Sequence, residues 1–309
     1  MTSLQLQCQV ADERAGTVLR DVVQAFESGF PGRIAGYYLH GTVADGTSIQ
    51  TSDLDIDIVV RDAFAGPDER RALQDLAGEI AKHSAVELDI DVTDQTTLGQ
   101  GAEPSFKVAS RLLFGQDIRP DVPLTPIDGW GREKMHRGYF LLMSVFERQP
   151  PACIPLPFPD PRDEFFGYLN RPVRDGSAEF SPGTRNLVRV SGWLATALLA
   201  HEAGQYVATK RECHRLYRDY FDDDWASLLE EMYASCRGDW EYRIPSDREA
   251  RRRLRSICRR TLAFENHFLL RYKPFIIQEL SQAQPGEPSR ATWLMERIPF
   301  EDVEIARVL

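Results

Sequence analysis

The sequence predicts an α+β protein in which a part with alternating helices and strands precedes an all-helical part. Two kinds of periodicity predict this order. In the first third of the chain, some stretches repeat apolar residues at the 3.6-residue period of a helix, and others repeat them at every second position, as a strand does. After the proline-rich stretch that follows, only the helical period recurs.

Helices and strands are expected to alternate before the proline-rich stretch. The expected helices carry an apolar stripe, of which Leu19, Val22 and Phe26 are an example. Helices are predicted over residues 11–28, 68–83, 105–114 and 132–147. Strands are predicted over residues 34–40, 53–60 and 85–92, with a polar turn at 41–52.

The proline-rich stretch 150–161 holds six prolines, which exclude a helix and disfavour a strand. We therefore interpret it as a linker between two domains, residues 1–150 and 151–309. Helices are expected in the second domain over residues 184–204, 209–221, 224–236 and 247–271. Pro285 and Pro288 are expected to break the chain before a short tail.

Composition narrows the class of protein. The 309 residues carry a net charge of −10 and are 42% hydrophobic, which is ordinary for a soluble globular chain. No apolar run approaches the ~20 residues that span a bilayer, and no secretory leader is visible. Five scattered cysteines fit reduced thiols, so we expect a cytoplasmic protein. The net negative charge favours a metal ion or a cationic substrate over nucleic acid.

The most informative feature is a pair of strands with an acid at every second position. Alternate residues of a strand share one face, so Asp53, Asp55 and Asp57 point one way and the aliphatic residues between them enter a core. A second strand repeats the pattern with Glu87, Asp89 and Asp91. Asp is depleted in strands and crowded carboxylates repel, so a bound Mg²⁺ is the expected reason. The plain alternative is a solvated strand face.

Gly41 and Thr42 stand at the end of a predicted strand, before the acidic strand. A glycine there lets the backbone approach a phosphate closely, and the hydroxyl of Thr42 can donate to a phosphate oxygen. This order of Gly-Thr, a turn and Asp-x-Asp resembles the signature of the nucleotidyltransferase superfamily with the DNA polymerase β-like palm. The stretch from Gly41 to Asp55 is most similar to the streptomycin/spectinomycin adenylyltransferases.

The resemblance implies a palm with a mixed sheet and flanking helices, followed by a helical domain that binds substrate and nucleotide. It implies Asp53 and Asp55 as catalytic ligands of Mg²⁺ and of the triphosphate of ATP, and Glu87 as the general base. The sequence does not choose between Asp89 and Asp91 as a third metal ligand, and Asp89 is our first candidate. The nucleotide would also contact Gly41, Thr42 and Ser52.

The helical part resembles the carboxyl-terminal domain of the same adenylyltransferases. It shares Arg185-Asn186, an apolar helix, Gly204 and Lys210, and Lys210 would contact the ATP phosphates. An acid that precedes the Arg-Asn pair in those enzymes is replaced here by residues 181–184, Ser-Pro-Gly-Thr. Because of this difference, the resemblance does not identify the molecule that would accept the nucleotide.

The implied reaction is Mg²⁺-dependent transfer of AMP from ATP to a hydroxyl of a small cationic acceptor, with an aminoglycoside as the first candidate. One alternative is the same transfer to a protein, a tRNA or a natural-product intermediate. Another is a nucleotide-binding regulator without activity. The arginine-rich stretch 248–260 is either a solvated face that pairs with acidic helices or a surface for RNA. The oligomeric state is left open.

Overall fold

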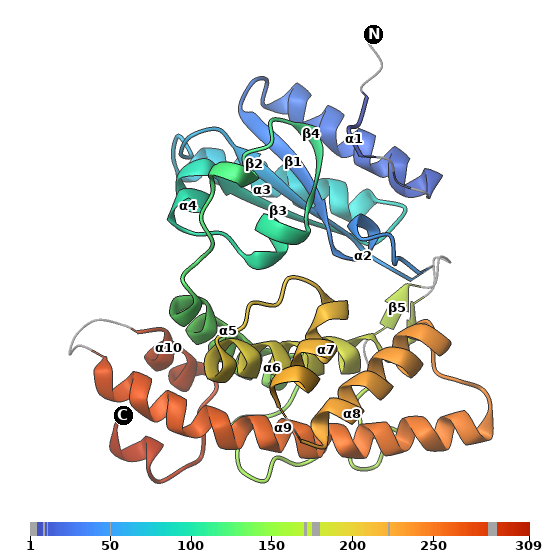
Figure 1. Cartoon of the computed structure of the whole chain (residues 1–309), viewed down its shortest axis with the longest axis vertical. Helices are drawn as coiled ribbons and strands as arrows, with labels where there is room; N and C mark the ends of the chain where they lie inside the picture. Colours follow the sequence, from blue (N-terminus) through green and yellow to red (C-terminus); the bar gives the residue numbers. More distant parts are fainter. Residues whose placement is uncertain are drawn as a thin grey trace. The chain divides into compact units, whose positions relative to one another are not determined.

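The structure is a computed structural model that describes residues 5–8, 10, 12–49, 51–169, 172–174, 180–221, 223–283 and 289–309. It has an α+β fold, as predicted (Figure 1). The chain forms two compact units, which divide between Pro126 and Ile127. Within the described ranges, every helix is too short or too polar to pass through a lipid bilayer.

A four-stranded mixed sheet organises the first unit, in the order β3-β2-β1-β4. Strand β1 pairs antiparallel with β2 and with β4, whereas β2 and β3 are parallel. A parallel pair requires a crossover connection, which α3 supplies. The bounds are β1 (Ile34–His40), β2 (Leu54–Val60), β3 (Leu88–Asp94), β4 (Arg111–Gly115) and α3 (Pro67–His83).

Helices α1 (Glu13–Gly29) and α3 pack on one face of this sheet (Figure 1). The predicted apolar stripe of α1 is fully buried there, against the aliphatic residues that alternate with the acids in β2 and β3. The same face buries Ile56 and Ile58 of β2. This burial fixes which side of the two acidic strands faces the core.

The opposite face of the sheet is covered only in part. A small apolar cluster joins Tyr38 of β1 and Val59 of β2 to Phe106. Its other buried residues come from the segments around three short helices, α4 (Gln95–Gln100), η1 (Ser105–Ala109) and η2 (Arg119–Asp121). Asp55, Asp57, Asp89 and Asp91 belong to this face by alternation, and each of them retains contact with solvent.

Three predictions for the first unit need correction. Residues 105–114 are not a helix: the helical turn η1 ends at Ala109, and β4 follows as an edge strand. Leu113 and Leu112 belong to clusters on opposite faces of the sheet, which is the alternation of a strand. Strand β3 begins at Leu88 rather than at Ala85. The turn at 41–52 begins with a single helical turn, α2 (Gly41–Ala44).

The second unit is helical, as expected, apart from a two-stranded ribbon that the sequence did not predict. The ribbon is β5 (Pro172–Arg174) with β6 (Phe180–Pro182). The helices are α5 (Ile127–Ser144), α6 (Arg185–Ala203), α7 (Lys210–Tyr220), α8 (Trp225–Glu231), η3 (Met232–Asp239), α9 (Arg248–Gln282), α10 (Arg290–Arg297) and η4 (Ile305–Arg307). Helix α9 continues through Pro274, beyond its predicted end at 271, because its buried stripe continues with Phe275, Ile276 and Leu280.

The proline-rich stretch 150–161 packs into the second unit. The amide of Ala152 donates to the carbonyl of Pro299 at 2.8 Å, and the amide of Glu301 donates to the carbonyl of Ala152 at 2.7 Å. Ala152 and Leu156 are both buried in the helical core. The division between the units therefore differs from the predicted boundary at 150 and falls before α5.

A buried cluster joins Arg148 and Tyr168, which lie on either side of the proline-rich stretch, to Glu265 of α9. The Arg148 guanidinium and the Tyr168 hydroxyl each donate to Oε2 of Glu265 at 2.6 Å. The side chain of Glu265 is fully buried. Burial raises the pKa of Glu265 to about 7, although Arg148 and Tyr168 act in the opposite direction.

This carboxyl predicts that stability depends on pH. Because the pKa is raised on folding, the folded chain holds a proton that the unfolded chain releases between pH 4.5 and about 7. Over this range we expect the free energy of unfolding to fall by roughly 3 kcal/mol more in the wild type than in Glu265→Gln. Urea denaturation at a series of pH values measures the difference, and equal pH dependence in both proteins would contradict it.

Candidate active site

The parallel register of β2 and β3 brings two rows of carboxylates side by side. Asp55 lies opposite Asp89, and Asp57 lies opposite Asp91. Neighbouring strands are about 4.8 Å apart, so each pair is within reach of one small cation. The two aspartates of β2 are half-buried and the two of β3 are exposed. The face is therefore accessible to a ligand.

Asp53 and Glu87 extend these rows by one step. They directly precede Leu54 and Leu88, which are paired in the register, and the Leu54 amide donates to the Glu87 carbonyl at 2.9 Å. Both side chains are half-buried. The pairing thus brings together the four acids to which the sequence assigned catalysis and metal binding, and their individual roles stay predictions.

His40 is a neighbour of the acids that the sequence analysis did not select. It ends β1 opposite Asp55, and its Nε2 lies 3.3 Å from Oδ2 of Asp57. Burial lowers the pKa of His40, but the hydrogen bond and charge of Asp57, with the charges of Asp55 and Asp91, outweigh it and raise the pKa to about 8. The imidazolium therefore offsets part of the negative charge at neutral pH. In the sequence, only the position of His40 beside Gly41 indicated that it could lie at this site.

Gly41 adopts a backbone conformation that brings it against Asp55. Its φ is +71°, and a Cβ at this position would lie 2.3 Å from Oδ2 of Asp55. The next residue, Thr42, is buried and donates from Oγ1 to Oγ of Ser52 at 3.1 Å. Ser52 also accepts from the amide of Ile49 at 2.9 Å. These bonds hold the Gly-Thr turn beside the start of β2.

The donor set at this end of the sheet fits Mg²⁺. Among the described residues, no group of three or more His, Cys, Asp or Glu side chains is arranged to hold a metal ion by itself. Mg²⁺ does not require such a cage, because it is commonly held by one or two carboxylates together with substrate phosphates. The register pair Asp55 and Asp89 supplies two hard oxygen donors of this kind.

Lys210, the remaining predicted nucleotide contact, begins α7 in the second unit. Thr209 caps this helix by accepting from the amide of Glu212 at 3.2 Å. The residues of the acidic face all belong to the first unit, so a joint role for Lys210 stays a prediction.

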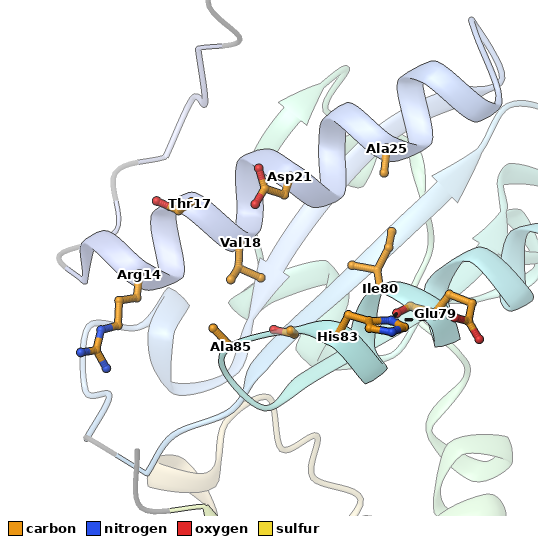
Figure 2. Close-up of a pocket in the computed structure, with 10 residues that line it drawn as sticks. Arg14, Thr17, Val18, Asp21, Ala25, Glu79, Ile80, His83 and Ala85 are labelled. Carbon is orange, nitrogen blue, oxygen red and sulfur yellow. Dashed lines mark hydrogen bonds and ion pairs between the residues drawn. The ribbon is translucent and has the colours of Figure 1, made fainter. Parts of the chain in front are cut away.

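A pocket of about 670 Å³ lies away from the acids, between α1 and the end of α3 (Figure 2). Val18, Ile80 and Ala85 line it, with Arg14 and His83 among its polar residues. Both helices pack on the face of the sheet that is opposite the carboxylates. The pocket is therefore separate from the candidate site.

Among known proteins, the chain is similar to a few solved structures. No family model matches the chain, and no curated protein matches it. It is similar to a toxin–antitoxin structure with AMP-PNP at 21% identity and a TM-score of 0.24, over 32% of this chain and 74% of that one. It is also similar to spectinomycin adenyltransferase AAD(9) from Enterococcus faecialis, with ATP and spectinomycin, at 10% identity and a TM-score of 0.42, over 81% and 98%. Similarities at this level do not establish an activity.

The contact between Gly41 and Asp55 predicts a difference between two glycine substitutions. Gly41 and Gly46 have φ angles of +71° and +74°, but only a Cβ at Gly41 would meet another atom within 4 Å. Alanine at either position costs about 1–2 kcal/mol of unfolding free energy from the backbone alone. We expect Gly41→Ala to cost clearly more, as measured by urea denaturation. Equal losses in the two variants would contradict the close packing of Gly41 on Asp55.

Proposed function

We propose that the chain is a Mg²⁺-dependent nucleotidyltransferase that moves AMP from ATP to a hydroxyl group of a small cationic acceptor. One observation supports this proposal above the others. The register of β2 with β3 aligns Asp55 with Asp89 beside Gly41, whose missing side chain leaves the backbone in close contact with Asp55. Paired carboxylates next to a half-buried glycine suit a metal-bound triphosphate.

The chain's own residues would hold the nucleotide in place. Asp53, Asp55 and Asp89 would bind Mg²⁺, which, when bound, offsets the negative charge of the phosphates. The Gly41 backbone would approach the triphosphate, and the Ser52 hydroxyl would donate to its oxygens, while Thr42 donates to Ser52 and holds it in place. Lys210 would contact the ATP phosphates.

The transfer itself requires positioning and removal of one proton. The acceptor oxygen forms a bond to the α-phosphorus, the bond from that phosphorus to the bridging oxygen breaks, and pyrophosphate leaves with the bond's electron pair. Glu87 would accept the proton of the acceptor hydroxyl. A positioned general base of this kind contributes typically ~10²–10⁴-fold to the rate.

An acceptor with positive charge is favoured by the electrostatics of the site. Four aspartates occupy paired positions on one face, and the two of β3 are exposed. This concentration of negative charge would attract a polycation and raise its local concentration. An aminoglycoside has both the amines and the hydroxyls that this reaction needs.

Pyrophosphate release tests the proposal. We expect release from ATP with Mg²⁺ and a panel of aminoglycosides, including streptomycin and spectinomycin. Asp53→Asn should abolish release, and Glu87→Gln should lower kcat by ~10²-fold or more with little change in KM for ATP. The exposed Asp75, on the outer helix α3, provides a matched control, and Asp75→Asn should leave the rate unchanged.

Other outcomes distinguish the remaining possibilities. Release without any drug, but with a protein, a tRNA or a biosynthetic intermediate, would keep the reaction and replace the acceptor. ATP binding without release for every acceptor would contradict transfer and favour a nucleotide-binding regulator. Release that persists in Asp53→Asn would exclude the acidic face as the catalytic site.

A further inference from the structure

The first half of α9 carries seven arginines between residues 248 and 260. Three of them pair with carboxylates of the same unit. Arg251 pairs with Glu164, while Arg253 and Arg260 lie 2.8 and 2.6 Å from the two oxygens of Glu231. These contacts agree with the first of the two interpretations of this stretch, but only for these three arginines.

The other four arginines form a stripe on the opposite side of the helix from the core. They are spaced by four, three and four residues, which places them on one helical face. The buried residues Leu254 and Ile257 lie on the other face. The stripe is about 16 Å long at the usual helical rise. Its members are Arg248, Arg252, Arg255 and Arg259, of which Arg255 is half-buried and the others are exposed.

An aromatic ring supports the middle of this arginine stripe. The guanidinium carbons of Arg255 and Arg259 lie 4.5 and 5.4 Å from the centre of the Phe166 ring. Phe166 in turn stacks on Phe158, with ring centres 4.2 Å apart. These contacts restrict two long side chains and lower the entropy that they lose on binding.

Arg255 also donates to the carbonyl of Glu164 at 2.6 Å, and the acids around this residue have other partners. Asp160 accepts from the amide of Arg162 at 2.9 Å, and Asp163 accepts from the amides of Phe165 and Gly167 at 2.7 and 3.1 Å. Glu164 pairs with Arg251. Within the part of the chain that the structure describes, no carboxylate forms an ion pair with any of the four arginines of the stripe.

We propose that the arginine stripe binds the phosphate backbone of a nucleic-acid duplex. All four side chains are arginine, whose guanidinium fork matches a phosphate better than the point charge of lysine does. Proteins that bind single strands offer aromatic rings to the bases, whereas Phe165 and Phe166 are buried beneath guanidiniums. The phosphates on the outside of a duplex can be bound by guanidinium groups alone, without stacking of the bases. The net charge of −10 is a sum over the chain and does not describe this local surface.

Fluorescence anisotropy tests this proposal. The full chain is titrated into a labelled mixed-sequence duplex of roughly 20 base pairs, at KCl concentrations between about 50 and 200 mM. Four phosphate contacts predict that log K falls with log [KCl] with a slope of about −3 to −4. The triple variant Arg248→Ala/Arg252→Ala/Arg259→Ala should weaken binding at least tenfold at the lowest salt and reduce the slope by about two to three.

A second triple variant controls for total charge. Arg20→Ala/Arg71→Ala/Arg307→Ala removes the same charge from exposed arginines elsewhere and should bind like the wild type. Circular dichroism confirms that each variant is folded. Equal loss in both triple variants, or no duplex binding at the lowest salt, would overturn the proposal. Tighter binding of a single strand or of polyglutamate than of the duplex would overturn it as well.

Discussion

The parallel pairing of β2 with β3 is the constraint on which the first unit depends. It sets Asp55 against Asp89 and Asp57 against Asp91, and like charges directly opposite each other destabilise a sheet. The register holds because the alternate residues are buried under α1 and α3. A slip by one residue would move every carboxylate into that core. Burial on one face of the sheet therefore imposes the crowding of charge on the other, where the His40 imidazolium beside Asp57 offsets part of it.

Most of the fold could be predicted because periodicity reports burial directly. The strand at Ile34–His40 and the helix that ends at His83 were predicted at those positions, since their apolar patterns are long and regular. The edge strand Arg111–Gly115 was missed because five residues are too few to distinguish the apolar period of a strand from that of a helix. The proline-rich stretch resembles a linker in composition, and only its hydrogen bonds with the segment 299–301 reveal that it packs in the helical core.

The candidate site was predictable to the extent that its residues lie on single strands. Alternation assigns Asp55 and Asp89 to one face, but their alignment depends on the pairing between strands, which no local pattern contains. The contact of His40 with Asp57 likewise arises from the antiparallel pairing of β1 with β2. The arginines of α9 show the same limit, because the sequence gives their spacing but not which of them have carboxylate partners.

We propose that the aligned carboxylates bind a divalent cation together with a nucleotide. Electron paramagnetic resonance of Mn²⁺, titrated in the presence of a non-hydrolysable ATP analogue, tests it most directly. We expect the wild type and Asp75→Asn to bind Mn²⁺ equally, and Asp55→Asn and Asp89→Asn each to weaken binding at least tenfold, or about 1.4 kcal/mol. Mn²⁺ binding that is unchanged in both Asp55→Asn and Asp89→Asn would exclude a cation site at these carboxylates.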